Sequence, residues 1–173
     1  MFELQYPIGK FSYPTHFESH SLETWMTVIR EFPTRLNESL ESVKNEVWLK
    51  TYRPGGWNII QVVHHCADSH MNAYIRLKLA LTEDKPVIKP YMENLWAELS
   101  DSSQVLPSVS QDILKGVHTR WICLLDSMKD GDWEKSYFHP ETKKETKLWQ
   151  MTALYAWHCE HHLAHIELAK KYT

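Results

Sequence analysis

The sequence predicts an all-α protein, a four-helix bundle with long crossover connections. Four long segments show the apolar spacing of amphipathic helices, and little of the chain alternates with the period of two that is typical of strands. Only five of the 173 residues are glycine, which suits a helical protein with few tight turns. The length and the 43% hydrophobic content predict one domain that spans residues 1–173.

The N-terminal part is expected to contain an arm, a first helix and a turn. Residues 1–17 combine aromatic side chains with two prolines and a glycine, which predicts an extended arm. Helical periodicity follows over residues 21–43, and Pro33 is expected to kink or divide this helix. The sequence YRPGGW at residues 52–57 predicts a turn.

The second helix has a clear start signal. Asn58 is a favourable N-cap, and Gln61 stands three residues later, as in a capping box. The helix is expected to end near Leu81. Residues 85–107 contain three prolines and predict a long crossover, with one short helix over residues 90–99.

Two further helices complete the predicted bundle. The third is expected to start at Ser108 or Ser110 and to end near Met128. Residues 129–147 predict another long connection, in which short strands are possible. The last helix is expected to cover residues 148–171.

Composition argues against several classes of protein. The chain carries 22 acidic and 19 basic residues, and the basic residues do not cluster, so we expect no nucleic-acid partner. No apolar run approaches the roughly 18 residues of a membrane span, and the N-terminus has no signal-peptide core, which predicts a cytoplasmic protein without a membrane partner. Three cysteines without C-x-x-C spacing predict reduced thiols.

Histidines are the most informative residues of the chain. The segment YAWHCEHHLAHIE places four of them within roughly a 100° arc of one helix. His158 and His162 are an i, i+4 pair, and so are His161 and His165, so spacing alone does not choose between the two pairs. The competing interpretation is that these histidines only make hydrogen bonds within the core.

A third imidazole is expected from the second helix. His65 borders the apolar face there, whereas His64 and His70 point elsewhere. A polar strip continues from His65 along the helix, and it is either a solvated surface or the lining of a cleft. Besides His65, the strip contains Gln61, Asp68, Asn72 and Arg76.

Three imidazoles from two facing helices predict a catalytic metal site, because three protein ligands leave coordination positions for water or substrate. The chain lacks an H-E-x-x-H motif and the paired Glu-x-x-His motifs of di-iron bundles. These absences favour one divalent ion, and imidazole ligands suit Zn²⁺, Ni²⁺ or Fe²⁺. We expect Zn²⁺ or Ni²⁺.

The motifs resemble a known family. YRPGGW, then QVVHHCADSHMNAYIRLKLALTED, IKPY, LWAEL and YAWHCEHHLAHIE closely resemble the YfiT-like branch of the DinB superfamily, over roughly residues 48–168. The resemblance implies an up-down-down-up four-helix bundle, often dimeric, with a three-histidine metal site. The family's ligand motifs fall on His65, three residues before Asp68, and on His158 and His162, with His161 as a non-ligand.

The resemblance implies a metal-dependent hydrolase, with metal-dependent thiol transfer as the alternative. In a hydrolase acting on a small molecule, the metal would activate water, and Asp68 would either transfer a proton or orient a histidine. Relatives in the wider superfamily use mycothiol or bacillithiol. In a thiol transferase, the metal would bind a low-molecular-weight thiol, and Gln61, Asn72 and Arg76 would bind its polar groups.

A third hypothesis is a non-catalytic, metal-binding homodimer, with some of the eight tryptophans in its interface. Cys159, next to His158, is interpreted as an inert core thiol rather than a redox thiol. The sequence assigns no role to His161 or His165.

Overall fold

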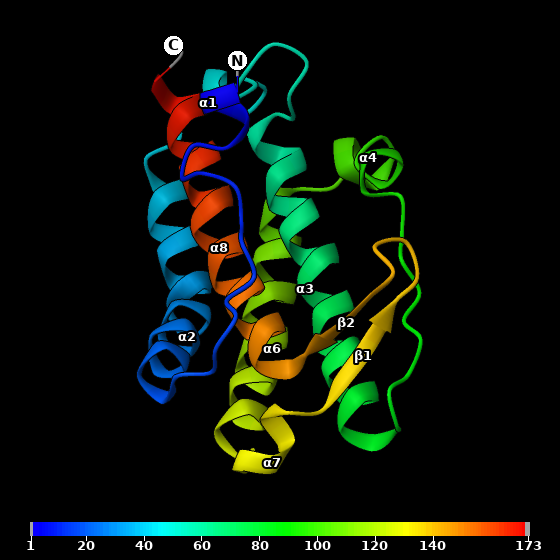
Figure 1. Cartoon of the computed structure of the whole chain (residues 1–173). Helices are drawn as coiled ribbons and strands as arrows, with labels where there is room; N and C mark the ends of the chain where they lie inside the picture. The colour runs from blue at the N-terminus through cyan, green and yellow to red at the C-terminus, as the bar shows by residue number, and fades with distance from the viewer. Residues whose placement is uncertain (1, 172–173) are drawn as a thin grey trace.

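Four long helices form a bundle in the computed structural model, which describes residues 2–171 (Figure 1). These helices are α2 (Ser19–Glu41), α3 (Ile59–Thr82), α6 (Pro107–Asp126) and α8 (Leu148–Lys171). Both α2 and α3 pack against α6 and α8. Figure 1 shows α2 and α8 running in one direction and α3 and α6 in the opposite one, so the order is up-down-down-up. The predicted all-α bundle is confirmed.

The connections contain short elements. In chain order they are α1 (Phe2–Gln5), a 3₁₀ turn (Asn45–Val47), α4 (Glu93–Trp96), α5 (Asp101–Gln104), α7 (Asp130–Trp133), β1 (Ser136–His139) and β2 (Lys144–Lys147). The strands pair antiparallel, with Ser136 opposite Lys147. The expected extended arm is therefore wrong at its beginning, where α1 lies beside the C-terminal turns of α8 (Figure 1). The first crossover contains two short helices instead of one.

Helix α2 continues through Pro33, so the expected division of this helix does not occur. Proline has no N–H, and in a helix this leaves the carbonyl four residues earlier without its usual donor. That carbonyl belongs to Ile29, which is fully buried. The Nδ1–H of His118 on α6 donates to it at 2.7 Å. A tertiary hydrogen bond thus replaces the missing helical one.

The predicted capping box of α3 is confirmed. The Gln61 N–H donates to Asn58 Oδ1 at 2.9 Å, and the Asn58 N–H donates to Gln61 Oε1 at 3.1 Å. The start of α6 was predicted one to three residues too late, because Pro107 occupies the first helical turn. Proline is favoured there, since the N–H of that position has no helical partner.

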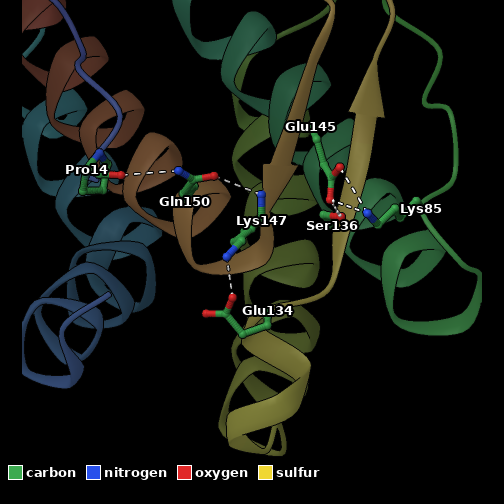
Figure 2. Close-up of polar contacts among 7 residues, drawn as sticks. All are labelled: Pro14, Lys85, Glu134, Ser136, Glu145, Lys147 and Gln150. Atoms are coloured by element: carbon green, nitrogen blue, oxygen red, sulfur yellow. Dashed lines mark hydrogen bonds and ion pairs between the residues drawn. The ribbon is translucent and has the colours of Figure 1, made fainter. Parts of the chain in front are cut away.

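Polar contacts fix the start of α8, which contains four of the eleven histidines (Figure 2). Gln150 Oε1 accepts the Lys147 N–H at 3.1 Å, and Gln150 Nε2 donates to the carbonyl of Pro14 at 3.3 Å. Figure 2 also shows Glu145, which accepts from Ser136 Oγ at 2.7 Å. The β1–β2 hairpin and the N-terminal segment therefore both make hydrogen bonds to the first turn of α8.

Helix α8 is also tied to α2 along its length. The guanidinium of Arg35 forms a two-bond ion pair with Glu160, with 2.9 Å between Nη2 and Oε2. Ser39 Oγ donates to Glu167 at 2.8 Å. None of the described helices is long and apolar enough to cross a membrane. The three cysteines are free thiols, as predicted.

Candidate metal centre

Three histidines from two helices meet inside the bundle. His65 lies in the second turn of α3, and His158 and His162 lie one turn apart on α8. One ring nitrogen of each lies within 4.8 Å of those of the other two. The Nε2 atoms of His65 and His158 are 3.2 Å apart. The structure thus brings the three predicted ligands together around one point.

The surroundings favour the neutral form of all three rings. Burial lowers the pKa of His65 to about 4, with a smaller contribution from nearby His165. Burial, followed by the neighbouring histidines, lowers the pKa of His158 and of His162 well below the usual range. Neutral imidazoles bind metals, whereas imidazolium does not, so the donor set fits a divalent ion near neutral pH.

The alternative pair on α8 faces different partners. The ring of His161 stacks on Trp157, with 4.3 Å between ring centroids, and its Nδ1 is buried without a hydrogen bond. His165 stacks on Tyr52 at 3.8 Å, and its Nε2 lies 3.2 Å from the carbonyl oxygen of Gln5. These contacts hold both rings beside the centre.

A cavity of about 370 Å³ opens over the three imidazoles. Its walls come from α1, the turn at residues 52–57, α4 and α8. Besides the histidines of α8 and His65, the lining contains Gln5, Tyr6, Tyr52, Arg53, Gly55, Gly56, Trp57, Glu93, Asn94 and Trp157. The volume and the polar groups suit a small-molecule ligand.

The PGG turn shapes one wall of this cavity. Gly55 has φ of +67°, a conformation that side-chain-bearing residues rarely adopt. A Cβ on Gly56 would lie 2.8 Å from Cγ of Arg53 and 3.1 Å from Cζ of Tyr52. The turn therefore lets Arg53 and Tyr52 fold over the backbone. Nε of Arg53 is buried without a hydrogen bond.

A second cavity, of about 400 Å³, is also lined by His158. Arg76 and His139 line it, and it shares Glu93 and Asn94 with the first cavity. Glu93 is exposed on α4, and partial desolvation, with a smaller contribution from Glu141, raises the pKa of its carboxyl. Glu93 is thus a carboxyl group that borders both cavities next to a predicted ligand.

The predicted polar strip of α3 is only partly at the cavities. Arg76 lines the second cavity. Gln61 donates from Nε2 to the carbonyl of Ala97 at 2.8 Å, and Asn72 donates to the carbonyl of Asp68 at 2.9 Å, so both amides are engaged within the fold. Asp68 lines neither cavity. Its half-buried carboxyl has a pKa raised to about 6 by burial and by Asp101.

Other candidates from the sequence serve the fold. His64 lies 2.7 Å from Ser110 Oγ, which links α3 to α6. Cys159 is fully buried, and burial raises the pKa of its thiol well above the usual range, which agrees with an inert thiol. Sequence reasoning missed Arg53 and Glu93. Arg53 lies in the predicted turn, but only tertiary packing places either side chain at the cavity.

The comparisons with known proteins agree with this geometry. The sequence profile of the DinB superfamily matches residues 29–166. The chain belongs to the DinB superfamily. Within that superfamily it is 44% identical over 171 residues to a Bacillus licheniformis protein named "Putative metal-dependent hydrolase", which covers 99% of this chain and 97% of the relative. A Bacillus cereus protein of the same name is 48% identical over 172 residues, covering 99% and 98%.

Solved structures show the same DinB fold. YfiT from Bacillus subtilis, described as a probable metal-dependent hydrolase with an unusual four-helix bundle topology, matches with a TM-score of 0.94 and 42% identity over 98% of each chain. The mycothiol-dependent maleylpyruvate isomerase matches with a TM-score of 0.67 and 15% identity, over 87% of this chain and 63% of the other. This second likeness shows a shared fold only.

Proposed function

We propose that this protein is a metal-dependent hydrolase of small molecules that contain an ester or amide carbonyl. The observation that carries the proposal is the convergence of His65, His158 and His162 beneath a cavity of about 370 Å³. The names of the relatives support the same activity. We further propose one divalent ion per subunit, Zn²⁺ or Ni²⁺, since imidazole suits both.

A divalent ion held by three imidazoles polarises a carbonyl and lowers the pKa of water to about 7. The residues that line the cavity would bind the substrate and exclude water. Arg53 is the cationic residue in the lining of the cavity, and its guanidinium would bind a carbonyl or carboxylate oxygen of the substrate. The aromatic walls of Tyr52 and Trp57 would bind its apolar part and exclude water.

Proton transfer needs a group that titrates near neutral pH within reach of the cavity. Glu93 meets the positional requirement, because it lines the cavity. Partial desolvation raises the pKa of its carboxyl. Asp68, the carboxyl group predicted from the sequence, has the suitable pKa of about 6 but lines neither cavity. We propose Glu93, rather than Asp68, as the proton-transfer group.

The thiol-transfer alternative has less support from the described residues. Of the three side chains predicted to bind a thiol cofactor, Gln61 and Asn72 are bonded within the fold, and Arg76 alone lines a cavity. We propose that Arg76 binds an acidic group of the ligand, whether this ligand is a hydrolysed substrate or a low-molecular-weight thiol.

We also propose a cytoplasmic homodimer. Exposed apolar side chains occur just before and on α4, around the start of α6 and between these helices, and exposed apolar side chains suit a protein partner. These residues are Met92, Leu95, Leu99, Leu106 and Val109. Light scattering of the purified protein tests the dimer, and the double variant Leu99→Glu/Leu106→Glu should shift the mass to that of the monomer.

The hydrolase is tested by turnover of aryl esters and anilides before and after metal removal. We expect turnover that a chelator abolishes and that Zn²⁺ or Ni²⁺ restores. In parallel, the protein is incubated with an electrophile and a low-molecular-weight thiol. Metal-dependent conjugation without ester or amide hydrolysis would replace the hydrolase with the transferase.

The carboxyl groups are separated by two matched variants, Glu93→Gln and Asp68→Asn. Loss of a general acid–base group lowers the rate by about 10²–10⁴-fold. We expect Glu93→Gln to lower kcat in this range while the metal is retained, and Asp68→Asn to lower it much less. The reverse result would assign the proton transfer to Asp68.

A further inference from the structure

His158 and His162, two of the proposed metal ligands, are each hydrogen-bonded to another histidine. On the His158 side, the hydrogen bonds continue through further imidazoles across the bundle. Along the first chain, Nδ1 of His158 lies 3.0 Å from Nε2 of His70. Nδ1 of His70 lies 2.7 Å from Nε2 of His118, and Nδ1 of His118 lies 2.7 Å from the carbonyl oxygen of Ile29. Three imidazoles therefore connect α8, α3 and α6 to a backbone carbonyl of α2.

The carbonyl fixes the direction of every bond in this chain. A carbonyl oxygen only accepts, so His118 must carry its proton on Nδ1. A neutral imidazole carries one ring proton, so Nε2 of His118 accepts, and His70 must donate from Nδ1. By the same reasoning Nε2 of His70 accepts from His158 Nδ1–H. The lone pair of His158 is thereby left on Nε2, the atom that faces His65.

Pro33 is the reason why Ile29 offers this carbonyl. In an uninterrupted helix the oxygen of Ile29 would accept from the N–H of residue 33, but proline has none. The buried oxygen consequently relies on His118 for its hydrogen bond. Loss of this hydrogen bond would leave the buried Ile29 carbonyl without a donor. The free-energy cost of an unsatisfied buried carbonyl holds His118 in the Nδ1–H tautomer.

The neutral form of each supporting ring is secured by its surroundings. His70 is fully buried, and burial favours the uncharged ring. Burial lowers the pKa of His118 to about 4. The ring of Phe32 packs against both, with centroid distances of 5.1 Å to His70 and 5.5 Å to His118. No carboxylate participates in this series of hydrogen bonds.

A second, shorter chain reaches the other ligand on α8. Nε2 of His165 lies 3.2 Å from the carbonyl oxygen of Gln5, so His165 donates from Nε2 and accepts on Nδ1. Nδ1 of His162 lies 3.4 Å from that acceptor. The proton of His162 is therefore placed on Nδ1, which again leaves the lone pair on Nε2. The N-terminal helix α1 supplies the carbonyl that ends this chain.

We propose that His70 and His118 on one side, and His165 on the other, are positioning residues that hold His158 and His162 in the Nδ1–H tautomer with both Nε2 lone pairs directed at the metal. This inference rests on the proposed metal centre. Metal-bound histidines commonly donate their other N–H to a carboxylate, carbonyl or water, and loss of such a partner weakens metal binding by about 10–100-fold. Here imidazoles take that place.

The first test reads the tautomers directly in metal-free protein. Two-bond ¹H–¹⁵N correlation spectra of ¹⁵N-histidine-labelled protein distinguish protonated from unprotonated ring nitrogens. We expect the proton on Nδ1 in His70, His118, His158 and His162, and on Nε2 in His165. A proton on Nε2 of His158 in the wild-type protein would overturn the inference. This readout requires no turnover, so it is independent of whether the protein is a hydrolase.

The second test compares His70→Phe with His70→Gln by measuring the dissociation constant for Zn²⁺. Glutamine retains a donor and an acceptor, whereas phenylalanine has neither. We expect His70→Phe to weaken binding by about 10–100-fold and His70→Gln to retain most of the affinity. His64→Phe, which removes a buried histidine bonded only to Ser110 and Val105, is the matched control and should destabilise the fold without changing the affinity. Equal affinities of a folded His70→Phe and of the wild type would contradict the proposal, and if His70→Phe does not fold, the wild-type spectrum decides.

Discussion

His118 should make the bundle sensitive to acid, and replacement by glutamine should remove this contribution. The ring is buried and its Nδ1–H is bonded to Ile29, so protonation in the folded state would place a charge in the core. Burial lowers its pKa from 6.5 to about 4. Between these two values the unfolded chain binds one proton more than the folded chain at this residue. The free energy of unfolding therefore falls as the pH drops from about 6.5 to about 4.

The size of the effect follows from the width of this window. One pKa unit corresponds to about 1.4 kcal/mol, and the shift spans roughly two and a half units, so His118 accounts for a loss of about 3 kcal/mol when the window is crossed. Above the window the stabilisation is fully present. His118→Gln keeps a donor for Ile29 and an acceptor for His70 but does not titrate. Histidines that do not contact His118 titrate alike in both proteins, whereas His70, whose pKa His118 helps to lower, adds to the difference in the same direction.

Urea denaturation of the metal-free wild type and of His118→Gln measures this difference at pH 7.5 and at pH 4.5. We expect the wild type to lose about 2–3 kcal/mol more than the variant between the two pH values. A stability difference that does not change with pH would refute the reasoning, because it would mean that His118 has similar pKa values in the folded and unfolded states.

Two further predictions concern the metal and the cavity wall. The ion would connect α3 to α8, so saturation at about 100 times the dissociation constant should add about 2.7 kcal/mol to the free energy of unfolding. A chelator should therefore lower Tm by roughly 5–10 °C in a thermal scan. An unchanged Tm would contradict a metal that binds the folded state. Gly56→Ala should raise KM with the metal retained, because the new Cβ would displace Arg53. Gly116→Ala is the control and should leave KM unchanged, because nothing lies within 4 Å of its Cβ. Steady-state kinetics that show the same KM in both variants would remove Arg53 from the substrate site.

Local signals in the sequence predicted the long helices well. The capping residues Asn58 and Gln61 act within one turn, so they fix the start of α3 without reference to the rest of the fold. Division of the helix at Pro33 was the wrong alternative, because the residue that bonds the freed carbonyl, His118, lies 85 positions later in the sequence. Periodicity cannot report a hydrogen bond between two helices.

The candidate site could also be predicted only in part from local signals in the sequence. Spacing placed His158 and His161 on one face of α8 but could not rank them, and the resemblance to a family made the choice. The structure separates them physically, since His158 faces His65 whereas His161 stacks on Trp157. The support from His70 was not predictable, because it depends on how α3 and α6 meet.

Metal content of single alanine variants tests the central claim most directly. Wild-type protein and His161→Ala, purified in parallel and loaded with Zn²⁺, should each retain about one ion per chain by elemental analysis. His65→Ala, His158→Ala and His162→Ala should each retain none while remaining folded. Retention of the ion by all three of these variants, or its loss from His161→Ala alone, would contradict the three-histidine centre.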